Sequence, residues 1–210
     1  MTNALLSALA FVGVVALFCW DRYSLYVARY ELAALQRASL RDPLTGLANR
    51  AGLAAGWEQL APARPWVAVI DLDGFKPVND THGHAAGDAV LRAVAARLAT
   101  VHGIAARLGG DEFAALLCDL DPVTAGRQLA AAIAAPVRLP SGVTVSVTAS
   151  IGLAPTTGDL AAALADADAA MYRAKTTRTG IAVFDPHRDD HATDIRPTVR
   201  VRDLMVEVGR

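Results

Sequence analysis

Apolar positions along the middle of the chain follow two kinds of pattern, short continuous runs and helix-spaced stripes. Residues 66–70 (WVAVI) form an apolar, β-branched run that Pro65 bounds, which is typical of a buried strand. In residues 85–101 the apolar side chains recur every three or four positions, at Val90, Leu91, Val94, Ala95 and Leu98. This second spacing predicts a helix with one face in the core.

The same reasoning predicts the order of elements in the central region. We expect a helix at about 49–60, a strand at 66–72, helices at 74–81 and 85–101, strands at 103–108 and 112–118, a helix at 121–135, a strand at 143–153, a helix at 158–176 and a strand at 181–184. This order favours an α+β, two-layer domain with helices packed on a central mixed, mostly antiparallel sheet.

The first 20 residues predict a membrane anchor. Residues 4–20 contain no charged side chain. As a helix they would span about 25 Å, slightly less than a hydrocarbon core of about 30 Å. Aromatic residues suited to the membrane interface follow, at Trp20, Tyr23, Tyr26 and Tyr30. A cleaved signal peptide is the first alternative, but the segment has no basic start and no small-residue cleavage site. A buried core helix is the second alternative.

Charge on either side of this segment predicts its orientation. Arginines follow it at positions 22, 29, 37 and 41, and no charged side chain precedes it. The positive-inside rule then places a single-pass chain in the inner (cytoplasmic) membrane, with the rest of the protein in the cytoplasm.

Residues 21–41 predict a linker helix, because Leu25, Ala28, Leu32 and Leu35 form a short heptad-like stripe. We expect it to promote a homodimer, the alternative being a helix that lies against the domain. Residues 186–210 carry both signs of charge and two prolines, which predicts a loosely ordered tail. The alternative is that residues 198–208 add an edge strand to the sheet.

Composition narrows the function classes. The chain has 210 residues, 53% of them apolar, and a formal net charge of −1, so it has enough apolar residues for a core and no excess of basic charge for nucleic acid. Of its 20 basic residues 18 are arginine, and the two lysines are Lys76 and Lys175. A genome-wide bias toward arginine would explain the ratio. Lysine also suits phosphate oxygens as a point charge, so both lysines are candidates for a triphosphate site.

Two acidic clusters follow predicted strands. Gly109 and Gly110 lie between two strand-like runs, which predicts a tight hairpin with Asp111 and Glu112 at its tip. Asp71 ends the buried strand at 66–72, where a carboxylate is costly unless it is paired or binds a cation. If the two strands are neighbours, Asp71 and Asp111 converge on one Mg²⁺, with the Leu72 carbonyl as a further ligand.

Six motifs in order resemble the GGDEF family of diguanylate cyclases, over roughly residues 42–185. They are residues 42–50 (DPLTGLANR), 71–80 (DLDGFKPVND), 83–88 (GHAAGD), 107–113 (RLGGDEF), 148–152 (TASIG) and 165–175 (ADADAAMYRAK). The resemblance implies a palm-like fold and the condensation of two GTP molecules into cyclic di-GMP with loss of two pyrophosphates. It also implies that two domains face each other, each holding one GTP.

The residues fit that chemistry. Asp71 and Asp111 would hold Mg²⁺, with Glu112 as the second choice of ligand or as proton acceptor. Gly74 and Phe75 precede a predicted helix, whose backbone N–H groups would bind phosphate. Lys76 and Lys175 would supply positive charge to the triphosphate. The family's phosphate-binding arginine has no match in register, and Arg178, one position early, is its candidate replacement.

Other residues of the motifs have predicted recognition or supporting roles. Asn79 and Asp88 can read the hydrogen-bonding edge of guanine, while Asp88 would also suit a helix N-terminus. Asp73, Asp80 and His84 are expected to be supporting hydrogen-bond partners, and Asp42 and Asn49 turn or cap residues.

One familiar feature is missing. Members of the family often carry an inhibitory Arg-x-x-Asp motif, and the corresponding window here is residues 100–103 (TVHG). We therefore expect no product inhibition through that site. The alternatives to an active cyclase are a catalytically weak GTP-binding regulatory module and a polymerase or other nucleotide cyclase of similar architecture.

Overall fold

The computed structural model describes residues 20–27, 40–118, 121–156 and 158–189, in two compact units that divide after Ser39. In the first unit, residues 20–27 are helical. No helix among the described residues is long and apolar enough to cross a membrane. Residues 4–19 of the predicted anchor, residues 28–39 of the predicted linker helix and the tail from 190 onward lie outside the described residues.

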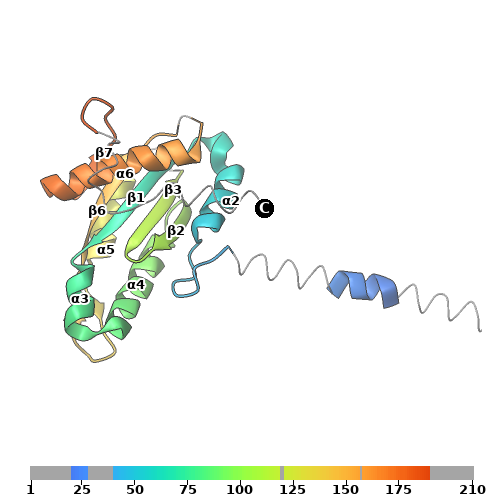
Figure 1. Cartoon of the computed structure of the whole chain (residues 1–210), viewed down its shortest axis with the longest axis horizontal. Coiled ribbons are helices and arrows are strands. Elements are labelled where there is room, and N and C mark those ends of the chain that lie inside the picture. Colours follow the sequence, from blue (N-terminus) through green and yellow to red (C-terminus); the bar gives the residue numbers. More distant parts are fainter. Residues whose placement is uncertain (1–19, 28–39, 119–120, 157, 190–210) are drawn as a thin grey trace, which may run out of the picture. The chain divides into compact units, whose positions relative to one another are not determined.

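The second unit is built on a five-stranded sheet (Figure 1). Its strands are β1 (Trp66–Asp73), β2 (Gly103–Gly109), β3 (Glu112–Leu117), β6 (Thr148–Ala154) and β7 (Ile181–Val183), in the spatial order β2-β3-β1-β6-β7. All neighbours are antiparallel except β6 and β7, which are parallel. The prediction of a mixed, mostly antiparallel sheet is therefore confirmed.

Helices cover both faces of this sheet, so the expectation of two layers was wrong. One face packs against α3 (Phe75–His82), α4 (His84–Leu98) and α5 (Pro122–Ala134). The other face packs against α2 (Arg50–Leu60) and α6 (Leu160–Thr177), and α6 crosses the sheet in Figure 1. The physical reason lies in β1, where Val67 and Val69 are buried on one side and Ala68 and Ile70 on the other.

Two further predicted elements differ from the structure. The single strand expected at 143–153 is divided into β5 (Thr144–Val145) and β6. β5 leaves the main sheet to pair with β4 (Val137–Arg138), which the sequence did not predict. The short helix η1 (Ala61–Ala63) was also not predicted, and α4 ends three residues earlier than expected.

The C-terminal boundary also differs. Asp189 was expected in a loose tail beginning at 186, but its side chain is fully buried and bonds the Arg173 guanidinium at 2.6 Å. Asp189 also accepts from the Asp185 N–H at 2.8 Å. This buried ion pair holds residues 185–189 against α6.

The backbone of α6 lies very close to the sheet at Gly152. A Cβ at this position would collide with the Ala167 carbonyl oxygen and the backbone of Met171. Glycine is therefore required for α6 to lie directly on β6.

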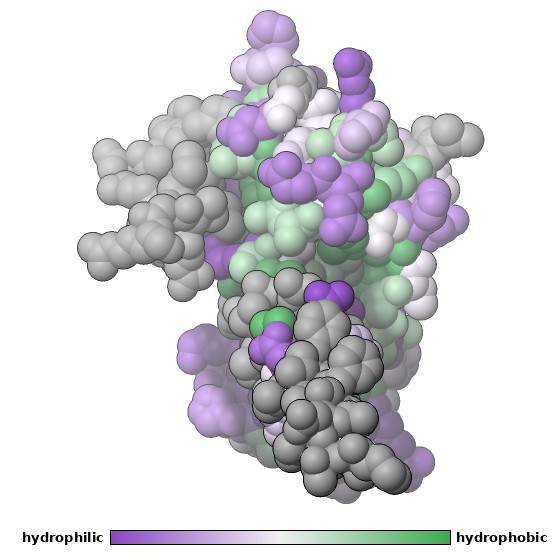
Figure 2. All heavy atoms as spheres, turned by 90° about the vertical axis from the view of Figure 1, so that its right-hand side faces the viewer, coloured by the Kyte–Doolittle hydropathy of each residue, from purple (hydrophilic) through white to green (hydrophobic). Residues whose placement is uncertain are grey.

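On the face turned toward the viewer in Figure 2, the described residues mix hydrophilic and hydrophobic side chains and show no single broad apolar area.

Candidate active site

The signature hairpin, which consists of β2, the Gly110–Asp111 turn and β3, forms as predicted. Gly109 and Gly110 both have positive φ, +151° and +53°, a conformation that glycine adopts without the steric cost of a Cβ. The register shifts between Arg107 and Gly109, so that Gly109 pairs with Glu112. This bulge and turn place Asp111 at the tip and Glu112 as the first residue of β3.

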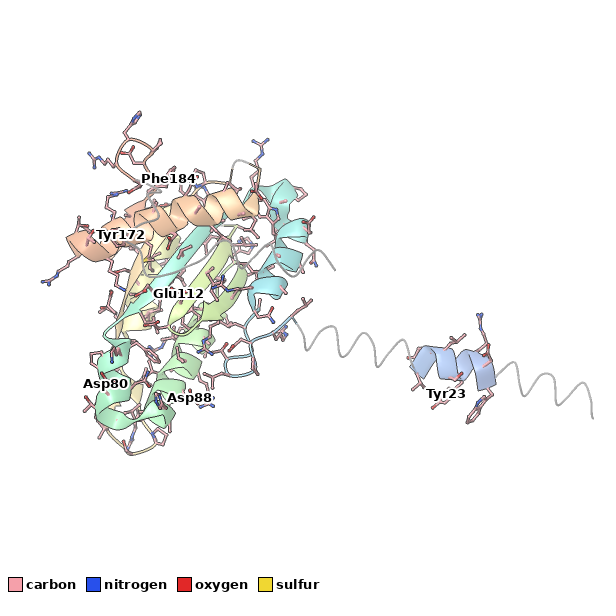
Figure 3. The ribbon with its side chains drawn as sticks, viewed as in Figure 1. Tyr23, Asp80, Asp88, Glu112, Tyr172 and Phe184 are labelled. Atoms are coloured by element: carbon pink, nitrogen blue, oxygen red, sulfur yellow. The ribbon has the colours of Figure 1, made fainter. Side chains whose placement is uncertain are left out.

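Glu112 lies directly opposite Asp71 across the β1–β3 pair. Because side chains alternate along a strand, Asp71 points to the same face as Val67 and Val69, toward α6. Figure 3 shows Glu112 over the sheet, well apart from Asp80 and Asp88. The two carboxylates at the centre of the site are therefore Asp71 and Glu112. Glu112, which the sequence predicted only as the second choice of metal ligand, lies directly beside Asp71.

Asp111 lies next to this pair. Its carbonyl accepts a hydrogen bond from the Leu72 N–H at 3.2 Å, which ties the turn to β1. Partial burial and the charge of Asp71 raise the pKa of the Asp111 carboxyl. Burial and the charges of Asp71, Asp111 and Asp168 raise the pKa of Glu112 to about 7, against an opposing effect of Arg50. The carboxylates thus repel one another, and a cation would relieve that repulsion.

Lys175 supplies positive charge at this position. Its Nζ, from the last turn of α6, bonds the Asp71 carboxylate at 2.6 Å. Partial burial alone would lower the pKa of Lys175, but the hydrogen bond and the charges of Asp71, Asp73 and Asp111 raise it overall. Lys175 therefore stays protonated. The structure thus brings together Lys175 and Asp71, two residues that the sequence predicted for the site.

The predicted phosphate-binding segment begins α3. Gly74 is the N-cap with φ +81°, and a Cβ there would meet no atom within 4 Å, so the backbone faces open space. The Phe75 side chain is buried in the core and fixes the start of the helix. Lys76 is exposed and bonds Asp80 at 3.0 Å, and its ammonium group has further N–H donors for a phosphate oxygen.

The predicted guanine-reading residues lie on neighbouring helices. Gly87 of α4 packs so closely on the Asn79 side chain of α3 that a Cβ on Gly87 would collide with its Oδ1. Asp88 follows Gly87 and forms a weak ion pair with Arg92 at 3.8 Å. The alternative role of Asp88 at a helix N-terminus was wrong, because α4 begins at His84 and its first turn holds no acidic residue.

The predicted supporting residues have mixed outcomes. Asp73 accepts from the Ser150 hydroxyl at 3.0 Å and Asp80 pairs with Lys76, as expected. His84 is exposed and makes no side-chain hydrogen bond within the described part of the chain, so its expected role was wrong. Arg178 is the C-cap of α6 with φ +56°, where the chain turns away from the helix. Its part in phosphate binding stays a prediction.

The two predicted cap or turn residues are confirmed. Asn49 is the N-cap of α2 and accepts from the Gly52 N–H at 2.9 Å. Asp42 accepts from both the N–H and the hydroxyl of Thr45, at 2.8 and 2.6 Å.

Two arginines at the site were not predicted. Arg107 bonds both oxygens of Asp42 at 3.2 Å and also donates to the Gly110 carbonyl at 2.8 Å. Arg50 donates to the Leu108 carbonyl at 2.9 Å. Both lie within the motifs, and the signal that could have identified them is their place beside the signature residues. Together the two arginines bind the carbonyls of Leu108 and Gly110, on either side of Gly109.

The donor set suits a hard divalent cation that also binds a substrate. Among the described residues, no three His, Cys, Asp or Glu side chains form a complete metal site. Asp71 and Glu112 are hard oxygen donors on one face, and Asp111 lies at the adjacent turn. Mg²⁺ commonly takes one or two carboxylates and completes its shell with water and phosphate oxygens. The residues therefore fit a hard divalent cation that completes its shell with water and phosphate oxygens.

Comparison with known proteins bears on this site. Residues 39–180 match the family described as "Diguanylate cyclase, GGDEF domain". An uncharacterized 19.3 kDa protein of Streptomyces ambofaciens is 48% identical over 144 residues, which cover 64% of this chain and 78% of that protein. Diguanylate cyclase DgcN of Escherichia coli is 43% identical over 160 residues. That match covers 70% of this chain but only 39% of DgcN.

A solved structure shares the fold. It contains the coiled coil and GGDEF domain of DgcB from Caulobacter crescentus in complex with c-di-GMP. The match has a TM-score of 0.70 at 26% identity and covers 81% of this chain and 98% of the DgcB chain.

Proposed function

Because the chain belongs to the GGDEF family of diguanylate cyclases, we propose that it condenses two GTP molecules into cyclic di-GMP. In each of two steps a ribose 3′-oxygen bonds the α-phosphorus of the other GTP and loses its proton. The bond from that phosphorus to the bridging oxygen breaks, and pyrophosphate leaves. The in-register pair of Asp71 and Glu112, with Lys175 beside it, is the observation that carries the proposal.

We propose that Asp71 and Asp111 hold Mg²⁺ with the Leu72 carbonyl, and the pairing of Asp71 with Glu112 supports Glu112 as a further ligand or proton acceptor. The ion would supply charge neutralisation for the 3′-oxygen and the leaving pyrophosphate. The chain's own residues would position the substrate: the start of α3 and both lysines would bind phosphate, and Asn79 and Asp88 would recognise guanine.

The test is incubation of the purified protein with GTP and Mg²⁺, followed by identification of the product by mass. We expect cyclic di-GMP and pyrophosphate from the wild type and none from Asp71→Asn, with the fold of the variant unchanged by circular dichroism. GTP binding without product would instead support the regulatory module. Wild-type product formation by both Asp71→Asn and Asp111→Asn would refute the metal assignment.

We also propose that the active form is a homodimer, since each catalytic step needs two GTP-loaded domains. The heptad-like stripe of residues 21–41 supports a dimerising linker, although residues 28–39 lie outside the described part. Activity of a chain beginning at Leu40 should rise more than linearly with enzyme concentration. Constant specific activity across its measured monomer–dimer transition would contradict this.

Finally, we propose that residues 1–20 anchor the chain in the cytoplasmic membrane with the GGDEF domain in the cytoplasm. Trp20, Tyr23 and Tyr26 support this, because they lie on a helix and are 70%, 63% and 67% exposed, as interfacial aromatic residues would be. The full chain should sediment with membranes and resist extraction by carbonate, whereas a chain beginning at Leu40 should not. Recovery of the full chain in the supernatant would refute the anchor.

A further inference from the structure

Arg50, the first residue of α2, uses only part of its hydrogen-bonding capacity. Its Nε donates to the Leu108 carbonyl at 2.9 Å. Its Nη1 is buried and has no hydrogen-bond partner among the described residues. A buried, charged N–H group without an acceptor is costly, so this position calls for a further partner.

Glu112 offers an acceptor near this group, because it pairs with Gly109 across the hairpin, one residue beyond the Leu108 carbonyl that Arg50 binds. Its carboxylate accepts no hydrogen bond from any described residue, and it is half-buried among other acidic side chains. Arg50 is a cation that acts on Glu112, and its charge favours the ionised carboxylate. The Arg50 Nη1 and the Glu112 carboxylate are thus two unpaired groups at the same end of the hairpin, and they are not bonded to each other in this structure.

The other arginine of the hairpin is already occupied. Arg107 donates to the Gly110 carbonyl and pairs with Asp42. These contacts link the hairpin turn to the beginning of the domain. Arg50 approaches from α2 and bonds the residue just before Gly109. The two guanidinium groups therefore act on different parts of the signature hairpin.

We propose that Arg50 is a positioning residue whose Nη1 donates to ionised Glu112 and holds that carboxylate beside Asp71. Glu112 and Asp71 would otherwise move apart, because like charges on directly opposed residues repel. The bond to Leu108 keeps the guanidinium in place, so Glu112 is tied through it to the start of α2. The role of this contact in catalysis rests on the proposed function, whereas the contact itself does not.

A double-mutant cycle tests the contact without substrate. Unfolding by urea is measured in EDTA at pH 8 for the wild type, Arg50→Met, Glu112→Gln and the double variant. If Arg50 bonds Glu112, the two effects on the unfolding constant should be non-additive by about threefold or more. If Arg50 serves only the Leu108 carbonyl, the effects should be additive, and that result overturns the proposal.

Arg97 provides a matched control. It also donates to main-chain carbonyls, those of Ile133, Ala135 and Pro136, but it has no described contact with the site. Arg97→Met combined with Glu112→Gln should therefore be additive. Should Arg50→Met fail to fold, the same cycle is run with Arg50→Gln, which removes the charge but keeps an N–H donor group.

Kinetics supply a second measurement. Arg50→Met should lower kcat for cyclic di-GMP formation about tenfold or more with little change in KM for GTP, because Glu112 acts on the reacting atoms rather than on ground-state binding. Arg97→Met should leave both parameters near wild type. An unchanged kcat in Arg50→Met would overturn the proposed positioning role. Because the urea cycle uses no GTP, it reports on the contact even if the proposed activity fails.

Discussion

Lys175 bonds Asp71 at 2.6 Å although 104 residues separate them in the sequence. The ion pair joins the last turn of α6 to the end of β1, at the place where a cation and a triphosphate are proposed to bind. Asp71 is largely buried and Lys175 is about half exposed. Under the proposed function, Lys175 would exchange Asp71 for a phosphate oxygen when metal and nucleotide bind.

We expect Lys175→Met to lower kcat/KM for GTP by about 10–100-fold, because a charged contact to the triphosphate is lost. The free energy of unfolding should change by less than about 1 kcal/mol, since partly exposed ion pairs contribute little. Product formation by chromatography and urea unfolding measure the two effects. A large loss of stability with unchanged kcat/KM would contradict the assignment and make Lys175 a structural residue.

Asp42 should make stability depend on pH. Burial alone would raise the pKa of Asp42, but hydrogen bonds from Thr45 and Arg107 lower it overall. A carboxyl with a lowered pKa stabilises the fold above its unfolded pKa of about 4, and this contribution is lost as the pH falls through the lower folded value. Asp42→Asn should cost about 1–3 kcal/mol at pH 7, and the difference from wild type should shrink below pH of about 4.

Urea unfolding of both proteins between pH 7 and pH 3 measures this effect. Asp80→Asn is the control, because the pair of Asp80 with Lys76 is exposed and should contribute less than about 1 kcal/mol at any pH. A difference between wild type and Asp42→Asn that stays constant over the whole range would contradict the prediction.

Gly152 should tolerate no larger residue. Gly152→Ala places a methyl group against the backbone of α6, which cannot give way as a side chain can. We expect a loss of about 1–3 kcal/mol or more in the free energy of unfolding. Gly126→Ala in α5 is the matched control: there the nearest atom is a Leu153 methyl at 3.0 Å, and helix propensity favours alanine by about 1 kcal/mol. Equal stability of the two variants would show that α6 moves freely on the sheet.

Cyclic di-GMP should inhibit only weakly and in competition with GTP. Residues 100–103 (TVHG) offer neither the guanidinium nor the carboxylate with which the inhibitory motif would bind the product's phosphates and guanine bases. Initial rates at several GTP concentrations with added product give the type of inhibition. Tight, non-competitive inhibition would show that a product site exists elsewhere or at these residues.

The sequence by itself determined the family and the order of the main-sheet strands and the α-helices. Periodicity located the buried strand and the helices to within a few residues, because apolar spacing depends on local geometry. The glycine pair predicted the hairpin for the same reason, since positive φ is a local property. The sequence could not show that β5 leaves the main sheet, or that Arg173 and Asp189 form an ion pair. Both features depend on partners that are distant in the sequence or come from another element.

Only the tertiary structure decided which carboxylate faces Asp71. Asp111 and Glu112 are adjacent in the sequence and chemically alike, and a strand turns by half a revolution at each residue, so a shift of one position exchanges their faces. The bulge at Arg107–Gly109 and the β1–β3 register place Glu112 opposite Asp71 and Asp111 at the turn. The third layer of helices and the approach of Lys175 and Arg50 likewise come from packing around β1, which brings together residues that no local pattern connects.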